Sequence, residues 1–374
     1  MNINLLLQHE DVYGIIKKLL LDKGFVKDWT GVSWAHSLFH SGELYFSLPR
    51  LNVIASLESL KLLEPFLQNR YNSRKPLLRL LQKIYIKLAC NSLVFVLLVS
   101  DKRLRIAWAR KGVYTILGGS SYVKIISHIE SFLISVPKET RSGCSVFDFE
   151  VDFRRGVDRS IGQLPLVEVS DDRFYVEPFY LYSHGIGGGG YIQSNQKVLK
   201  TVERYMQSLH SIHHVRISVD TYQCLFYSQL NQHLQKTDSP IFHLVSLLFE
   251  RISDFGPIDY SITHGDLQLC NILVNNGRVY LIDWESLNFR ATVYDEIVLY
   301  SSSRHNLDQL DRFIESNKIS TGDIFVSHLR DKYGKSLHKF LYLYYLEELL
   351  YRLIYRKGEI CPIETWSKNV LSKI

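Results

Sequence analysis

The chain has 374 residues, of which 46% are apolar and 22% are charged, so it is long enough for two or three compact globular units. Its five cysteines are scattered and form no Cys-x-x-Cys pair, which argues against a disulfide framework and against a structural zinc site. The formal net charge is +6, and no nucleic-acid-binding motif accompanies it, so we expect no nucleic-acid partner.

The amino terminus lacks a basic segment followed by an apolar core, so we expect no signal peptide. The longest apolar run covers residues 93–99 and is far shorter than a membrane span. Scattered cysteines are typical of a reducing compartment. The sequence therefore predicts a cytoplasmic protein without a transmembrane segment.

Residues 1–92 are predicted to contain helices over 11–22, 57–69 and 76–89, with a short extended piece over 44–48. This region carries no catalytic motif. We expect an extension that binds a partner or substrate, or that packs against the rest of the chain.

The third of these helices belongs to a basic segment. Its basic residues are Arg70, Arg74, Lys75, Arg79, Lys83 and Lys87. They could attract an anionic glycan, a nucleotide or a membrane surface, so peripheral membrane contact is possible. The alternative, which we favour, is the solvated face of an amphipathic helix whose leucines and isoleucines form the buried side.

From residue 93 the pattern changes to short apolar runs separated by tight turns. Strands are predicted over residues 93–99, 104–109, 114–117, 122–126, 145–153, 166–170 and 173–179, with a helix over 127–136. Short strands with tight turns favour an antiparallel sheet.

A glycine run at residues 185–190, GIGGGG, matches the pattern G-x-G-x-x-G. One interpretation is a dinucleotide-binding loop of an oxidoreductase or a methyltransferase. We favour a flexible connection, because no βαβ unit surrounds the run. Helices are predicted to follow over residues 195–254.

The most informative stretch covers residues 261–286, SITHGDLQLCNILVNNGRVYLIDWES. An Asn-Gly step between two short β-prone runs predicts a hairpin. The hairpin would bring Asn271, just before one strand, and Asp283, just after its partner, to the same open end. Asp266 lies five residues before Asn271, so three oxygen-bearing side chains are expected in one small volume.

This donor set suits a particular chemistry. Carboxylate and amide oxygens are ligands that Mg²⁺ prefers, usually alongside phosphate and water oxygens. A carboxylate that is not on the metal can accept a proton from a substrate hydroxyl, as phosphoryl transfer requires. The competing interpretation is an ordinary hairpin with polar residues at its ends.

HGDLQLCNIL followed by LIDWE resembles the catalytic core of the aminoglycoside phosphotransferase and choline kinase family. The resemblance implies an α+β, two-lobed protein-kinase-like fold: an antiparallel small lobe over 93–182, a helical catalytic and acceptor-binding lobe over 183–374, and an α/β extension over 1–92. It implies an ATP- and Mg²⁺-dependent phosphotransferase acting on a hydroxyl of a small molecule or glycan. Asp266 would be the catalytic base, and Asn271 and Asp283 would hold Mg²⁺.

The resemblance also implies roles in the small lobe. Lys124 would steady the nucleotide phosphates, with Glu130 as its partner, and Glu177 would lie at the adenine-binding hinge. Two alternatives stay open: Lys124 can be a solvent-facing strand residue, and Ser127 with Glu130 can be a helix capping box. The phosphate-covering loop is expected either at residues 118–121 or near 111–112.

The last third adds two expectations. Asp295 is expected to anchor a loop after the metal site, as the resemblance implies. The helix predicted over 341–355 carries Glu347 and Glu348, which could hold a cationic substrate, although we favour the polar edge of a core helix. A kinase-like scaffold that binds nucleotide without turnover is the alternative function.

Overall fold

The computed structural model divides the chain into two compact units. The first unit holds Met1–Arg159, Gln163–Gly188 and Leu273–Tyr280, and the second holds Ser160–Gly162, Gly189–Ile272 and Leu281–Ile374. The structure describes residues 12–31, 44–70, 76–118, 122–138, 146–157, 161–170, 174–180, 184–185, 196–233, 240–301, 332–333, 337–355, 366–368 and 370–371.

The first unit is built on a nine-stranded sheet in the order β1-β4-β2-β3-β5-β6-β7-β9-β8, and every neighbouring pair is antiparallel. The strands are β1 (Val26–Gly31), β2 (Leu44–Leu48), β3 (Val53–Ser56), β4 (Lys102–Trp108), β5 (Tyr114–Gly118), β6 (Tyr122–Ser127), β7 (Phe132–Pro137), β8 (Glu168–Ser170) and β9 (Phe174–Pro178). Strands from residues 1–92 and from 93–182 thus share one sheet.

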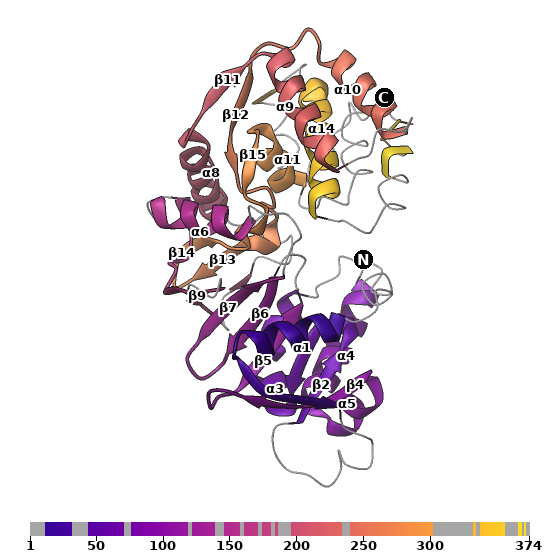
Figure 1. Ribbon diagram of the computed structural model, residues 1–374, viewed down its shortest axis with the longest axis vertical. Coiled ribbons are helices and arrows are strands. Elements are labelled where there is room, and N and C mark those ends of the chain that lie inside the picture. Colours follow the sequence, from indigo (N-terminus) through magenta and orange to yellow (C-terminus); the bar gives the residue numbers. More distant parts are fainter. Residues whose placement is uncertain are drawn as a thin grey trace. The chain divides into compact units, whose positions relative to one another are not determined.

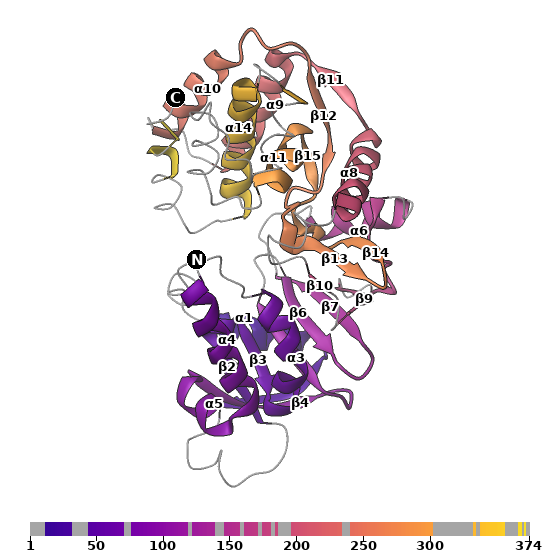
Figure 2. The ribbon, with the colours of Figure 1, turned by 180° about the vertical axis from the view of Figure 1, so that it is seen from behind.

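Helices cover both faces of this sheet, as Figures 1 and 2 show. Successive strand residues point to opposite faces. Tyr45 packs with α1 (Val12–Asp22), whereas its neighbour Phe46 packs on the other side with α3 (Leu57–Arg70), α4 (Pro76–Asn91) and α5 (Leu93–Val99). Each face of the sheet therefore has an apolar core of its own.

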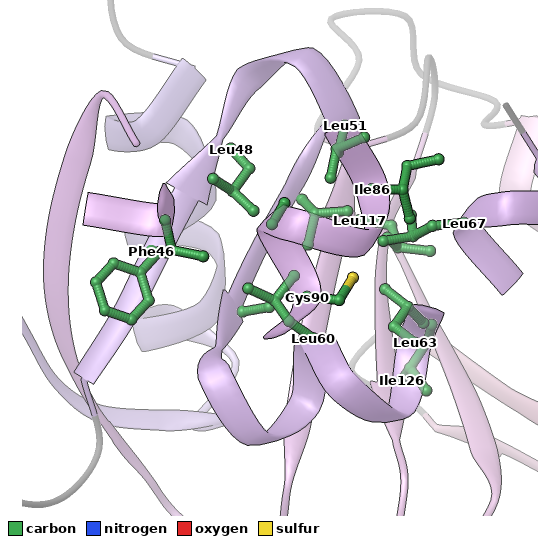
Figure 3. Packing of buried hydrophobic residues seen from close by; sticks show 14 of the residues in the cluster. Phe46, Leu48, Leu51, Leu60, Leu63, Leu67, Ile86, Cys90, Leu117 and Ile126 are labelled. Atoms are coloured by element: carbon green, nitrogen blue, oxygen red, sulfur yellow. The ribbon is translucent and has the colours of Figure 1, made fainter. Parts of the chain in front are cut away.

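Figure 3 shows the core under α3 and α4. Ile86 and Cys90 of α4 are fully buried against Leu63 and Leu67 of α3. Burial raises the pKa of the Cys90 thiol to about 12, so this cysteine stays protonated at neutral pH. The inner face of α4 is therefore an ordinary hydrophobic contact.

The outer face of α4 differs from the expectation. Leu77, Leu80 and Leu81 are 70%, 55% and 54% exposed, so the apolar positions expected to be buried lie largely in solvent. Within the described residues, no single helix is long and apolar enough to span a bilayer, although α4 and α5, bent by 112° at their junction, pass together on length and composition.

Three predicted elements of this unit were wrong in type. Residues 93–99 form α5 instead of a strand, because the Ser92 side chain caps the helix by accepting the Phe95 N–H. The predicted helix over 127–136 is a turn followed by β7, and Ser131 adopts a positive φ of 55° in that turn. The predicted strand over 145–153 is the helix α6 (Val146–Gly156).

The second unit combines helices with a three-stranded sheet in the order β11-β12-β15. Its described elements are α8 (Gln196–Ser211), β11 (Val215–Ile217), α9 (Val219–His233), α10 (Pro240–Arg251), β12 (Ile258–Thr263), β15 (Asn288–Ala291), α11 (Val293–Ser301) and α14 (Leu337–Tyr355). Helices α8, α9 and α10 confirm the helical content predicted for 195–254, except that residues 215–217 form β11. The described residues also confirm the α+β class.

The predicted hairpin is also confirmed. Strands β13 (Ile272–Asn275) and β14 (Arg278–Leu281) flank a turn at Asn276 and Gly277, both at positive φ. A short strand, β10 (His184–Gly185), pairs with β13. Residues 119–121 and 186–190, which hold most of the proposed phosphate-covering loop and of the glycine run, lie outside the described residues.

Candidate active site

Three oxygen-bearing residues of the candidate catalytic stretch, residues 261–286, all belong to the second unit: Asp266, Asn271 and Asp283. Asp266 follows the end of β12, Asn271 ends the short 3₁₀ helix Leu269–Asn271, and Asp283 follows β14. The backbone N–H of Ile282 donates to the carbonyl of Asn271 at 2.9 Å, which closes the open end of the hairpin. The two hairpin ends are thus held together as predicted.

His264 joins the loop before Asp266 to the segment before Asp283. Its ring is fully buried: Nδ1 accepts the Asp266 backbone N–H at 3.3 Å, and Nε2 is 3.1 Å from the carbonyl of Ile282. Because Nδ1 accepts, Nε2 carries the proton and donates. Burial lowers the pKa of His264, although Asp295, Asp266 and Asp283 oppose this, so the ring is neutral and positions the loop.

Gly265 lets the chain make the turn that presents Asp266. Its φ is +75°, a conformation that residues with a side chain rarely adopt. A Cβ added at Gly265 would also lie within 2.4 Å of an Arg290 guanidinium nitrogen and closer still to the carbonyl oxygen of Ser286. Buried Arg290 donates to that carbonyl at 2.9 Å, so the space beside Gly265 is already filled.

Asp266 and Asn271 are linked through backbone and side chain. The Asn271 amide nitrogen donates to the carbonyl of Asp266 at 2.8 Å, and Gln268 donates its side-chain N–H to an Asp266 carboxylate oxygen at 2.5 Å. Asn271 is 7% exposed, so its amide is held in one orientation. With its nitrogen toward the loop, the amide oxygen is the atom chemically suited to bind a cation.

Asp283 has an uncommon backbone. Its φ and ψ are 69° and 55°, the left-handed region, and its side chain does not cap the 3₁₀ helix Trp284–Ser286 that follows. Residues other than glycine held in this region often lie at functional sites. The next residue, Trp284, is 1% exposed and packs on His264 with ring centroids 4.5 Å apart, which fixes the chain on both sides of Asp283.

Asp295 anchors this loop. Fully buried in the first turn of α11, it accepts the backbone N–H of His264 at 2.7 Å with one oxygen and that of Gly265 at 2.8 Å with the other. His210 of α8 lies 3.3 Å from the same carboxylate. Burial opposes ionisation, but the hydrogen bond and charge of His210 hold the pKa of Asp295 below its ordinary value. The anchored segment is the loop before Asp266, and not, as expected, a loop after the predicted metal ligands.

Lys124, Glu130 and Glu177 lie in the first unit. Lys124 is half-buried on β6. Glu130 lies in the turn before β7, where its carboxylate accepts the Ser127 hydroxyl at 3.2 Å. Ser127 and Lys124 are three residues apart on one strand, so their side chains point to opposite faces of the sheet. The pairing of Lys124 with Glu130 stays a prediction.

Glu177 belongs to a buried charge cluster that the sequence analysis missed. Arg154 of α6 donates to Glu177 at 2.8 Å and to Glu150 at 3.2 Å, and all three side chains are buried. Tyr122 and Tyr175 also donate to Glu150, at 2.7 and 2.9 Å. Burial favours a neutral side chain, yet Glu177 and Glu150 raise the pKa of Arg154, which stays charged. The i, i+4 spacing of Glu150 and Arg154 signalled this pair.

Glu347 and Glu348 of α14 are buried in the second unit. One oxygen of Glu347 accepts the Tyr222 hydroxyl and the Ala291 N–H, each at 2.9 Å. Glu348 accepts the Tyr294 hydroxyl and pairs with Arg352, each at 2.8 Å. These partners support the interpretation of both residues as polar groups of a core helix.

The donor set of the catalytic stretch fits Mg²⁺ by its chemistry, because Asn271 and Asp283 offer an amide and a carboxylate oxygen. Among the residues that the structure describes, no three His, Cys, Asp or Glu side chains converge as a metal site by themselves.

The chain is similar in structure to small-molecule kinases. A choline/ethanolamine kinase family protein from Mesorhizobium loti matches with a TM-score of 0.44 and 12% identity, covering 78% of this chain and 92% of that chain. The choline kinase LicA from Streptococcus pneumoniae matches with a TM-score of 0.39 and 13% identity, covering 70% and 88%.

An aminoglycoside phosphotransferase, a thermostable mutant in a ternary complex with AMP-PNP and hygromycin B, matches with a TM-score of 0.44 and 10% identity, covering 68% and 90%. These structures come from the group that the motifs resemble. No protein-family model matches the chain, and no curated protein matches it. The functional proposal rests on the residues of the catalytic stretch.

Proposed function

We propose that this protein is an ATP- and Mg²⁺-dependent phosphotransferase of the cytoplasm that transfers the γ-phosphoryl group to a hydroxyl of a small molecule or glycan. One observation carries the proposal: Asp266, Asn271 and Asp283 lie on one loop-and-hairpin segment that His264 and Asp295 hold by hydrogen bonds. Phosphoryl transfer depends mostly on positioning and charge neutralisation, and oxygen ligands held by such a segment would support both.

Asp266 would accept the proton of the acceptor hydroxyl. Asp266 is half-buried, and the hydrogen bond from the Gln268 side chain orients its carboxylate. A positioned base of this kind contributes to the rate by taking the proton as the new P–O bond forms. The neutral ring of His264 supports the loop and is not assigned the base role.

Asn271 and Asp283 would hold Mg²⁺ through their side-chain oxygens. When bound, the ion supplies neutralisation of the phosphate charge. The fixed amide of Asn271 and the restrained backbone of Asp283 favour this role, because ligands that are already in place lose little freedom on binding.

In the first unit, Lys124 would steady the phosphates, Glu130 would be its partner, and the backbone around Glu177 would hold the adenine. The ion pair of Arg154 with Glu177 supports the last role, because it fixes the end of β9. Glu130 bonds to Ser127, whose side chain points to the face of the sheet opposite to that of Lys124. A lysine that is not supported by Glu130 would favour the alternative function, a scaffold that binds nucleotide without turnover.

The test is Mg²⁺-dependent release of ADP from ATP across a panel of amino alcohols, aminoglycosides, sugars and anionic glycans. We expect one acceptor class to stimulate turnover in the wild type. Asp266→Asn should lower that turnover by roughly 100-fold to 10,000-fold, because the variant cannot accept the proton.

Asp254→Asn is the matched control, since Asp254 is a largely exposed carboxylate of the same unit. It should retain wild-type turnover. Stabilisation by ATP with no turnover across the panel would favour the scaffold. Stabilisation by NAD or S-adenosylmethionine, with none by ATP, would instead support the dinucleotide-binding interpretation of the glycine run.

A further inference from the structure

The outer face of α4 carries an apolar stripe in solvent. Leu77, Leu81, Ile84 and Leu88 are 70%, 54%, 47% and 43% exposed. Their spacing of i, i+4, i+7 and i+11 places them along one side of the helix. We refer to these four residues as the apolar stripe.

The apolar stripe lies roughly opposite the face that packs on the protein. Ile86, Ala89 and Cys90 are fully or almost fully buried in the core shared with α3. At 100° per residue these positions cluster on the other side of the helix from the apolar stripe. Helix α4 is therefore attached by one face, where Ile86 and Cys90 point into the core (Figure 3), and presents a second apolar face to solvent.

A row of positive charge runs along the flank of α4, between the apolar stripe and the buried face. Arg79, Lys83 and Lys87 are spaced four residues apart, so they form one row on the helix, and all three are exposed. No acidic residue occurs anywhere between residues 65 and 100. The next helix, α5, adds Val94 and Leu98, which are 68% and 71% exposed.

We propose that α4, with α5 beside it, is a docking surface for an anionic lipid membrane. Leucines beside a lysine and arginine row, without acidic residues, are the composition of helices that lie in the plane of a bilayer. The apolar stripe would enter the headgroup boundary, while the long basic side chains reach the lipid phosphates. This inference is independent of the proposed phosphotransferase activity.

Two other occupants fit the composition less well. Protein interfaces are enriched in aromatic residues and depleted of lysine, whereas the exposed residues of α4 include two lysines and no aromatic side chain. Proteins that bind single-stranded nucleic acid stack bases on exposed aromatic rings, and Tyr85, the aromatic residue of α4, is only half-exposed.

The test is flotation of the full-length chain with two kinds of vesicle, phosphatidylcholine alone and phosphatidylcholine mixed with phosphatidylglycerol. We expect binding to the mixed vesicles, weaker binding at high salt, and little binding to phosphatidylcholine alone. Each basic residue near an anionic surface contributes about 1 kcal/mol, so the triple variant Arg79→Gln/Lys83→Gln/Lys87→Gln should lose roughly 100-fold in partition.

A second variant, Leu77→Gln/Leu81→Gln/Leu88→Gln, removes the apolar contribution and should also lose roughly 100-fold or more. The matched control is Lys197→Gln/Lys200→Gln/Arg204→Gln on α8. It removes the same charge from an exposed helix face without exposed apolar residues, and should bind like the wild type. All substituted positions are exposed or half-exposed, so circular dichroism and the melting temperature should stay unchanged.

Three results would overturn the proposal. The wild type could fail to bind mixed vesicles, or the α8 variant could lose as much binding as the α4 variants. The third result is a dimer in sedimentation velocity that the leucine variant abolishes, without vesicle binding, which would assign the apolar stripe to a second copy of the chain.

Discussion

At the scale of single residues, Glu347 illustrates how burial shifts a titration. Burial raises the pKa of this carboxyl to about 7 from an ordinary value of 4.5, against the opposing charge of Arg290. Between these two values the native chain keeps a proton that the unfolded chain has lost, so the free energy of unfolding falls as pH rises. The loss amounts to about 3 kcal/mol once the pH exceeds 7.

Glu347→Gln should remove this pH dependence. Glutamine can place its amide oxygen where one carboxylate oxygen accepts from both Tyr222 and Ala291, so both bonds are retained. In urea unfolding, the free energy of unfolding of the variant minus that of the wild type should be about 3 kcal/mol larger at pH 8 than at pH 5. Glu250→Gln, at an exposed glutamate of α10, should show no such gain. An equal gain in both variants would contradict the assignment to burial.

The hairpin of the candidate catalytic stretch could be predicted because its signal is local. A hairpin with an Asn-Gly turn fixes which residues meet at its open end, so the closure between Asn271 and Ile282 followed from spacing alone. The contact of His210 with Asp295 could not be predicted, because 85 residues separate the two and no local pattern links them.

At the scale of elements, α11 stabilises the loop before Asp266 through its first turn. Asp295→Asn leaves a single acceptor oxygen for the backbone N–H groups of His264 and Gly265. One buried donor then loses its acceptor, which should cost about 1 to 3 kcal/mol. Amide hydrogen exchange over residues 264–266 should speed up more than exchange in β12.

Asp220→Asn provides the comparison for this experiment. Asp220 also lies in the first turn of a helix, α9, but it is exposed. Its substitution should change neither unfolding nor loop exchange by a measurable amount. If Asp295→Asn leaves loop exchange at the wild-type rate, α11 does not hold the loop.

Helices and strands were confused where the chain is uniformly apolar. Residues 93–99 have the β-branched composition of a strand, yet a single N-cap serine makes them a helix. The capping pattern at Ser127 and Glu130 misled in the other direction, because the Ser127 hydroxyl donates to the Glu130 carboxylate within the turn before β7 and no helix begins there. In both places one side chain decided the outcome.

At the scale of the whole molecule, nucleotide binding should register as stability. A ligand that binds only the native state at about 100 times its Kd adds about 2.7 kcal/mol. ATP with Mg²⁺ should therefore raise the melting temperature by several degrees. EDTA should remove the Mg²⁺-dependent part of this rise in melting temperature. Asp283→Asn should remove the same part, because the substitution weakens one proposed metal ligand.

Asp254→Asn should keep the full EDTA-sensitive shift, since its carboxylate is exposed outside the catalytic stretch. A shift in the Asp283 variant equal to that of the wild type would exclude Asp283 as a ligand. The melting temperature is also measured with ATP in the absence of Mg²⁺. The shift caused by the nucleotide alone is thereby distinguished from the shift that depends on the metal.

The organisation of the first unit was harder to predict than its elements. Helices α1 and α3, and strands β2, β5 and β6, lie close to their predicted positions. The sheet order, in which β4 lies between β1 and β2, depends on pairings between residues far apart in sequence. Alternating burial specifies which face of a strand is inside, but not which strand is its neighbour.

The acid-free segment that contains α4 and α5 has one more consequence. Its six lysines and arginines account for the entire formal charge of +6, so the remaining residues are balanced in sign. The net positive charge of the molecule therefore equals the charge of this one segment. Near an anionic surface the field would exert a torque that turns α4 to face it before contact, and within a Debye length this would favour productive collisions.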